Sequence, residues 1–176
     1  MDHHDGLSIG GSLRMRLALF QPDIPQNVGA AIRLCACLEV GLDIIEPCRF
    51  PLDDRSMKRA ALDYGPLAHM TRHASWEAFV AGLPSGQRLV LLTTRGDRLF
   101  PGISFGPDDI ILMGAESAGA PEKVHRAATA RLRIPISPAA RSLNVVTAAT
   151  LALGEALRQN NAFPASLHPP AGTPPA

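Results

Sequence analysis

The sequence predicts a single α/β domain with a mostly parallel sheet and helices on both of its faces. Short apolar runs alternate along the chain with longer segments of helical periodicity. Strands that alternate with helices are typical of parallel sheets, because each parallel connection needs a crossover. The length of 176 residues suits one domain, which can bury about two-thirds of its unfolded surface without a disulfide or a metal.

The first half of the chain contains three predicted strands and two predicted helices. Residues 16–20 (RLALF) and 42–45 (LDII) are short and apolar, as buried strands are, and residues 67–71 (LAHMT) look extended. Residues 27–37 form the first predicted helix, which begins at a residue type that can cap it. Residues 53–63 form the second.

The second half of the chain continues the same alternation. Its predicted strands are residues 88–93 (RLVLLT), 109–113 (DIILM) and 131–136 (RLRIPI). Its predicted helices are residues 75–81, 121–128 and 144–160. Pro121 suits the first turn of a helix. Residues 145–153 carry no charged side chain, so we expect this part of the last helix to be buried.

The ends of the chain and its composition set further limits. Residues 1–14 are expected to form a flexible extension, residues 15–160 the domain, and residues 161–176 a flexible tail rich in Pro and Ala. The net charge of +1 does not by itself indicate a nucleic-acid binder, although a local basic patch remains open. Neither a signal peptide nor a long apolar span is present, which predicts a cytoplasmic protein with no membrane contact.

The three cysteines are best interpreted as reduced thiols. Cys35, Cys37 and Cys48 are odd in number and lie in apolar surroundings. On a helix, Cys35 and Cys37 point to different sides, so buried packing is favoured over a metal site. His69 and His73 are spaced for a metal on a helix, but the local sequence looks extended and no third ligand is nearby. No metal is therefore predicted.

Three loops that follow predicted strands carry polar side chains. Ligands bind at the carboxyl ends of the strands in open sheets of this kind, so these loops are candidate sites. In the first, Asn27 and Gly29 precede Arg33 by one to two helical turns. Taken alone, they fit an N-cap, a small packing residue and a solvated arginine.

The second loop is rich in glycine, and the third has more polar side chains than a helix cap needs. Gly114 and Gly119 bracket Glu116 in the second, although a glycine-rich turn between strand and helix is also common architecture. The third has Arg141, Ser142 and Asn144 directly before the last helix. One helix needs one cap, so these residues are a surplus. Neither a dinucleotide fingerprint nor a phosphate loop is present, which disfavours a nicotinamide enzyme.

Together the loops resemble a known family. The segments IPQNVGAAIRLCA, LMGAESAGAP and RIPISPAARSLNVVTAAT resemble, in order and spacing, the three motifs of the SPOUT RNA 2′-O-methyltransferases. The segment IIEPCRFPLDDRSMKRAALDY is similar to the subgroup that methylates the wobble nucleotide, position 34, of tRNA. The resemblance covers residues 17–159.

The resemblance implies a fold, a cofactor and site residues. It implies a C-terminal deep trefoil knot, a homodimer, and S-adenosylmethionine held by Leu92, Gly114, Ile134 and Ser142. Arg33, Glu116 and Asn144 would be catalytic. The tRNA anticodon stem-loop would contact Asn27, Arg55, Lys58, Arg59 and Arg141. Where many relatives read G-P-E-x-R-G, this chain has Ala118 in place of the arginine, so no phosphate contact is expected from that position.

Two alternatives stay open from the sequence. One is methylation of another tRNA or rRNA nucleotide, with cytidine and modified uridine both possible at position 34. The other is a non-catalytic knotted RNA-binding protein, against which Arg33, Glu116 and Asn144 argue. The family arginine is often described as the general base. A guanidinium stays protonated, however, so Arg33 is better suited to binding a phosphate and stabilising a developing oxyanion.

Overall fold

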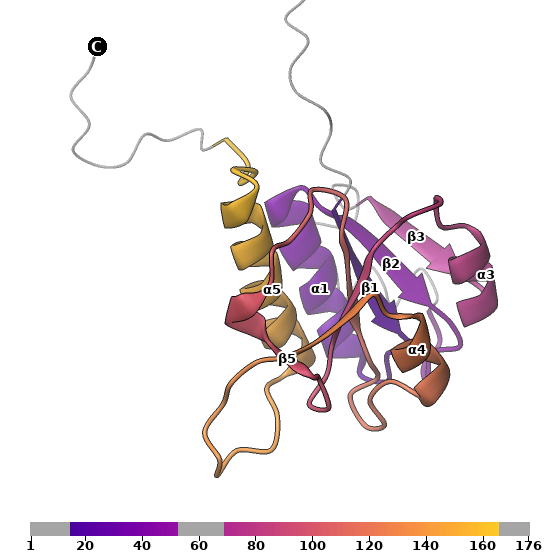
Figure 1. The fold of residues 1–176 in the computed structure, drawn as a ribbon. Helices are drawn as coiled ribbons and strands as arrows, with labels where there is room; N and C mark the ends of the chain where they lie inside the picture. Colours follow the sequence, from indigo (N-terminus) through magenta and orange to yellow (C-terminus); the bar gives the residue numbers. More distant parts are fainter. Residues whose placement is uncertain (1–14, 53–68, 166–176) are drawn as a thin grey trace, which may run out of the picture.

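The computed structural model describes residues 15–52 and 69–165. Within them a seven-stranded, all-parallel sheet has the strand order β3-β2-β1-β6-β4-β7-β5 (Figure 1). The strands are β1 (Arg16–Phe20), β2 (Gly41–Ile45), β3 (Met70–His73), β4 (Leu89–Leu92), β5 (Arg98–Leu99), β6 (Ile110–Met113) and β7 (Ala130–Arg133). The helices are α1 (Pro25–Leu38), α3 (Trp76–Ala81), the 3-10 turn η2 (Phe100–Gly102), α4 (Glu122–Ala127) and α5 (Val145–Gln159).

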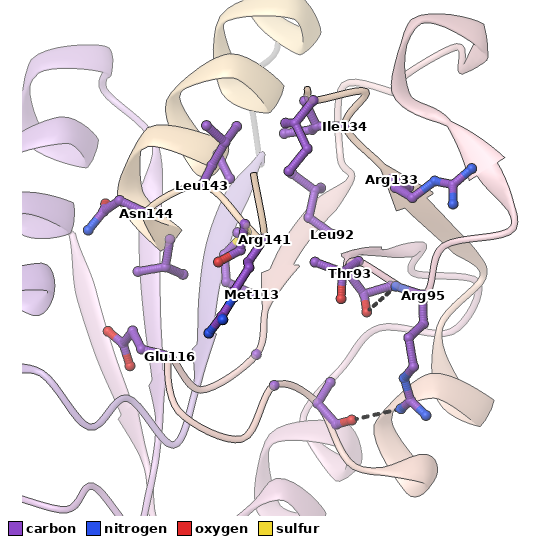
Figure 2. Close-up of a pocket in the computed structure, with 18 of the residues that line it drawn as sticks. Leu92, Thr93, Arg95, Met113, Glu116, Arg133, Ile134, Arg141, Leu143 and Asn144 are labelled. Atoms are coloured by element: carbon purple, nitrogen blue, oxygen red, sulfur yellow. Dashed lines mark hydrogen bonds between the residues drawn. The ribbon is translucent and has the colours of Figure 1, made fainter. Parts of the chain in front are cut away.

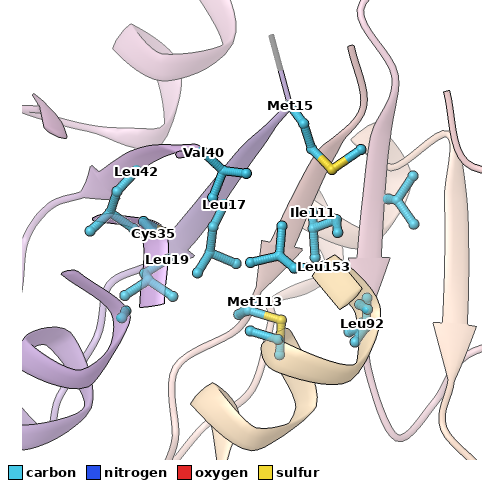
Figure 3. Packing of buried hydrophobic residues seen from close by; sticks show 14 of the residues in the cluster. Met15, Leu17, Leu19, Cys35, Val40, Leu42, Leu92, Ile111, Met113 and Leu153 are labelled. Atoms are coloured by element: carbon cyan, nitrogen blue, oxygen red, sulfur yellow. The ribbon is translucent and has the colours of Figure 1, made fainter. Parts of the chain in front are cut away.

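Helices cover both faces of this sheet, which confirms the predicted α/β class. The pleat sends alternate strand residues to opposite faces, and each face has its own apolar cluster. Leu17, Ile111 and Met113 pack with α1 and α5 on one face (Figure 3). On the other face, Leu91 and Leu112 pack with α3 and α4. Figure 1 shows α1 and α5 side by side, away from α3 and α4.

Several boundaries differ from the sequence prediction. The third strand runs from Met70 to His73 and pairs in parallel with β2, so it extends two residues beyond the predicted 67–71, of which residues 67 and 68 lie outside the described part of the chain. The last strand ends at Arg133 rather than at residue 136, because the chain turns away from the sheet after it. The two-residue strand β5 was missed because it is exposed and has no apolar pattern. The predicted helix 53–63 lies outside the described residues.

Two interpretations of α1 are corrected. The helix begins at Pro25, whose missing N–H costs nothing in the first turn, and Ile24 caps it without a side-chain hydrogen bond. Asn27 is therefore not the cap. Cys35 is buried as expected, whereas Cys37 on the next face of the helix is exposed; all three cysteines are free.

The strand order places the loops of the candidate site along one edge of the sheet. Strands β1, β6, β4 and β7 are neighbours, and because they are parallel, their carboxyl ends lie along one edge. The turns after β1, β4 and β6 and the long loop from β7 to α5 all leave from this edge. Within the described residues, no helix is both long and apolar enough to cross a membrane.

Candidate active site

A large pocket opens at the carboxyl ends of β4, β6 and β7, with a volume of about 1160 Å³. The four residues that the sequence assigns to a cofactor, Leu92, Gly114, Ile134 and Ser142, all line it. Leu92 and Ile134 lie on one side, and the turn after β6 closes another (Figure 2). The structure thus brings together residues that are up to fifty positions apart in the chain.

Bare backbone forms the pocket wall at Gly114. A Cβ atom added there would lie 2.6 Å from the nitrogen of Ala120 and 2.6 Å from the carbonyl carbon of Gly119, so no side chain fits. Gly119 has a positive φ of 68°, a conformation that favours glycine. Ala115 and Gly119 exchange two backbone hydrogen bonds, of 3.1 and 2.8 Å, which close the turn. The turn therefore presents main-chain groups to any ligand in the pocket.

A chain of side-chain amides ties the three loops together. Asn144 Nδ2 donates to Asn27 Oδ1 at 3.0 Å, and Asn27 Nδ2 donates to Glu116 Oε1 at 2.9 Å. Asn144 Oδ1 also accepts from the backbone nitrogens of Val146 and Thr147, so it caps α5. Asn27 is 9% exposed, and both ends of its amide have partners. Asn144 thus serves as cap and as bridge, while Ser142 is left to line the pocket.

The carboxyl groups of Glu116 and Asp23 form a pair beside this chain. Asp23 N donates to Glu116 Oε2 at 3.0 Å, while Asp23 Oδ2 accepts from Ser117 N at 3.2 Å and from the Ser117 hydroxyl. Burial, followed by the hydrogen bond with Asp23, raises the pKa of Glu116. The same side-chain hydrogen bond lowers the pKa of Asp23 to about 2.

Sequence reasoning missed Asp23. It lies in the predicted first loop, but an aspartate between Pro22 and Pro25 has no spacing that distinguishes it from a turn residue. Only the fold shows that it meets Glu116, which is 93 positions away.

Two of the basic residues predicted for the site, Arg33 and Arg141, lie in the described part of the chain. Arg141 lines the pocket, and its side chain points inward (Figure 2). Arg95, which was not predicted, also lines the pocket and donates to the carbonyl oxygen of Ala120 at 3.3 Å. Arg33 lies on the exposed side of α1 and does not line this pocket. Arg55, Lys58 and Arg59 lie outside the described residues.

His73 contacts the carboxylate of a buried aspartate. Its Nε2 is 2.7 Å from Oδ1 of the buried Asp43, which also binds Arg16. The local strand is extended, as expected.

Known proteins resemble this chain in both sequence and structure. Residues 14–154 match the model of the family described as the SpoU rRNA Methylase family. A protein of Beijerinckia indica, named tRNA (cytidine(34)-2′-O)-methyltransferase, is 54% identical over 148 residues, which cover 84% of this chain and 92% of that protein.

Solved structures agree with this match. A structure described as giving insights into the 2-OH methylation of C/U34 on tRNA has a TM-score of 0.81 and 38% identity, covering 86% of this chain and 99% of that one. An AdoMet-bound rRNA methyltransferase from Sinorhizobium meliloti has a TM-score of 0.75 and 27% identity, covering 84% of this chain and 57% of that one.

Proposed function

This chain belongs to the SpoU rRNA methylase family, and on that premise we propose that it methylates the ribose 2′-hydroxyl of nucleotide 34 in tRNA, with S-adenosylmethionine as methyl donor. The observation that carries this function is the pocket of about 1160 Å³ at the carboxyl ends of β4, β6 and β7. Proteins named for methylation at cytidine 34 match most of this chain, which supports the assignment of the nucleotide.

The residues present fit S-adenosylmethionine. Leu92 and Ile134 offer apolar contact to an adenine ring and main-chain groups to its polar edge. Gly114 packs closely against the backbone of Gly119 and Ala120, which fixes the turn whose main chain would face the cofactor. Ser142 adds a hydroxyl donor from the loop before α5. When bound, the sulfonium supplies an electrophilic methyl group.

The polar residues would hold the ribose in line with that methyl group. Correct alignment of two reactants lowers a barrier by several kcal/mol, on the order of 7–11 in the best cases. The Asn144–Asn27–Glu116 chain fixes the side chains of three loops relative to one another. Such rigid groups need no reorganisation during the reaction.

A homodimer accounts for the position of Arg33. This side chain lies outside the pocket of its own chain, and we infer that a partner subunit brings it to the reacting ribose. Leu143 and Leu151, which are 37% and 46% exposed, supply apolar surface on α5 and the loop before it for such a contact. In this arrangement Arg33 binds a phosphate or the developing oxyanion.

The remaining parts of the proposal concern the knot and the RNA. Residues 134–144 and α5 correspond to the C-terminal trefoil knot of the SPOUT fold, and the loop's contribution to the pocket supports this correspondence. Arg141, together with Arg55, Lys58 and Arg59, would contact the anticodon stem-loop, since phosphates attract arginine and lysine. The substrate implies a cytoplasmic protein.

The function is tested with purified protein, radiolabelled S-adenosylmethionine and two tRNAs. One carries cytidine at position 34, and the other carries 2′-deoxycytidine there as its matched control. We expect the methyl group to enter the first tRNA only. Equal incorporation into both would move the activity to another nucleotide. Absence of S-adenosylmethionine binding in calorimetry would favour a non-catalytic RNA-binding protein.

A further inference from the structure

The reaction needs a group that removes the proton of the 2′-hydroxyl, and the pair of Asp23 and Glu116 supplies one. We propose that the Glu116 carboxylate is this proton acceptor, and that Asp23, whose backbone nitrogen donates to Glu116 Oε2, is a positioning residue. The inference rests on the methyltransferase function proposed above, and it replaces an arginine as the general base.

The geometry separates the roles of the two acids. Glu116 lines the pocket, whereas Asp23 stands behind it and does not. Glu116 Oε1 accepts from Asn27, and Oε2 accepts from the backbone nitrogen of Asp23, so the carboxyl group is held in one orientation. Ser117 holds Asp23 in turn through its nitrogen and its hydroxyl. Of the two acids, Glu116 is therefore the one placed to meet a substrate in the pocket.

One carboxylate oxygen of Asp23 accepts no hydrogen bond within the described part of the chain. Its Oδ1 is buried and has no hydrogen-bond partner among the described residues. A buried polar atom without a partner is costly. The neighbouring Glu116 carboxyl becomes a donor when it is protonated, and the interaction between the two acids raises the pKa of Glu116 and lowers that of Asp23. Proton uptake by Glu116 thus satisfies the pair, and two adjacent negative charges are avoided.

The chemical step is balanced without a further reactant. The ribose 2′-oxygen forms a bond to the methyl carbon as the sulfur–methyl bond breaks, and the electron pair of that bond stays on sulfur. The 2′-O–H bond breaks, and its proton goes to the Glu116 carboxylate. The products are the 2′-O-methyl ribose, the neutral thioether and a protonated Glu116, which releases its proton to water before the next turnover.

The other groups around the pair leave Glu116 as the acceptor. Burial raises the pKa of the Cys48 thiol to about 11, so Cys48 is neutral and contributes no charge near neutral pH. Arg49 lies close enough to Asp23 to favour its ionised form. Arg141 lines the same pocket, where its guanidinium can attract the oxyanion.

The test is the pH dependence of single-turnover methyl transfer, at saturating S-adenosylmethionine and tRNA. Asp23→Asn removes a negative charge, so we expect the midpoint of the pH–rate profile to move down by about one unit or more. Ser117→Ala removes a donor from the ionised pair, so we expect a smaller shift upward. Glu116→Gln should slow the reaction and abolish the inflection. Asp108→Asn, at the other end of β6, is the matched control and should leave the midpoint unchanged.

Opposite shifts for the two variants support the pair, because a merely structural role would lower the rate without moving the midpoint. Unshifted midpoints in folded variants would overturn the proposal, as would a wild-type profile in Glu116→Gln. If Asp23→Asn does not fold, the sign of the Ser117→Ala shift decides. A wild-type protein that binds S-adenosylmethionine but methylates no tRNA at any pH contradicts the proposed function itself, which distinguishes the two failures.

Discussion

The side-chain amide of Asn27 has a donor and an acceptor on one group, and the site uses both. It donates to Glu116 and accepts from Asn144, in a place where only 9% of the residue is exposed. Neither a carboxylate nor a hydroxyl offers this combination at both ends. The identity of the residue therefore follows from the partners on the two other loops.

Replacing Asn27 with Leu tests whether the site needs both hydrogen bonds of the Asn27 amide. The change leaves Glu116 Oε1 and Asn144 Nδ2 without their partner, so we expect the free energy of unfolding to fall by about 1–3 kcal/mol. Methyl transfer should slow as well, because Glu116 loses its orientation. The neighbouring Gln26 is exposed, and Gln26→Leu should change stability by no more than about 0.5 kcal/mol. Urea titration measures both variants, and equal stabilities would contradict the account.

Gly114 allows a second prediction for a single residue. An alanine Cβ would lie 2.6 Å from backbone atoms of Gly119 and Ala120, which cannot give way as a flexible side chain can. We expect Gly114→Ala to weaken S-adenosylmethionine binding at least about tenfold, or ~1.4 kcal/mol. Gly154→Ala in α5 meets no atom within 4 Å and should instead stabilise the fold by about 0.5–1 kcal/mol. Calorimetry that gives equal affinities for Gly114→Ala and wild type would exclude a backbone cradle.

At the scale of the element, α5 explains why its entrance carries more polar residues than one cap requires. Asn144 accepts from two backbone nitrogens of the first turn and donates across to Asn27. Ser142, two residues earlier, faces the pocket instead. The same short segment therefore begins a helix, links it to α1 and lines the pocket, with a different side chain for each task.

Two substitutions at Asn144 separate the cap from the bridge. Asn144→Asp keeps an oxygen for the α5 nitrogens but leaves the buried Asn27 Oδ1 without its donor, so we expect slower methyl transfer and a free energy of unfolding lower by about 1–3 kcal/mol. Asn144→Ala loses the bridge and the cap and should lower the free energy of unfolding by about 1 kcal/mol more. Thermal unfolding and methyl-transfer rates measured together check the pair. Full activity in Asn144→Asp would show that the bridge is dispensable.

The elements also show what could be predicted from the sequence. Apolar runs such as RLALF located the buried strands to within a few residues, because a strand buried on both faces is mostly apolar. The exposed strand β5 has no such run and was missed. The cofactor-side residues came from motif resemblance, whereas Asp23 and Arg95 have no local pattern. They reach the site only through the order of strands in the sheet, which local sequence does not encode.

At the scale of the whole molecule, the near-neutral net charge of +1 requires tRNA binding to depend on a few local cations. Among the described residues, Arg141 is the predicted cationic RNA contact, and it lines the pocket. We expect tRNA affinity to fall with salt, and Arg141→Ala to reduce the slope of log affinity against log salt by about one unit. Lys123→Ala, on α4 and paired with Glu77, is the control and should keep the slope. A salt-independent affinity would count against phosphate contacts.

The account depends most on the claim that this chain methylates the 2′-hydroxyl of nucleotide 34. The most direct measurement is 2′-O-methyl mapping of cellular tRNA from cells with and without this gene. The account predicts that methylation at position 34 disappears in the deletion strain and returns with the wild-type gene, but not with a gene carrying Gly114→Ala. Methylation at position 34 that persists without the gene would contradict it.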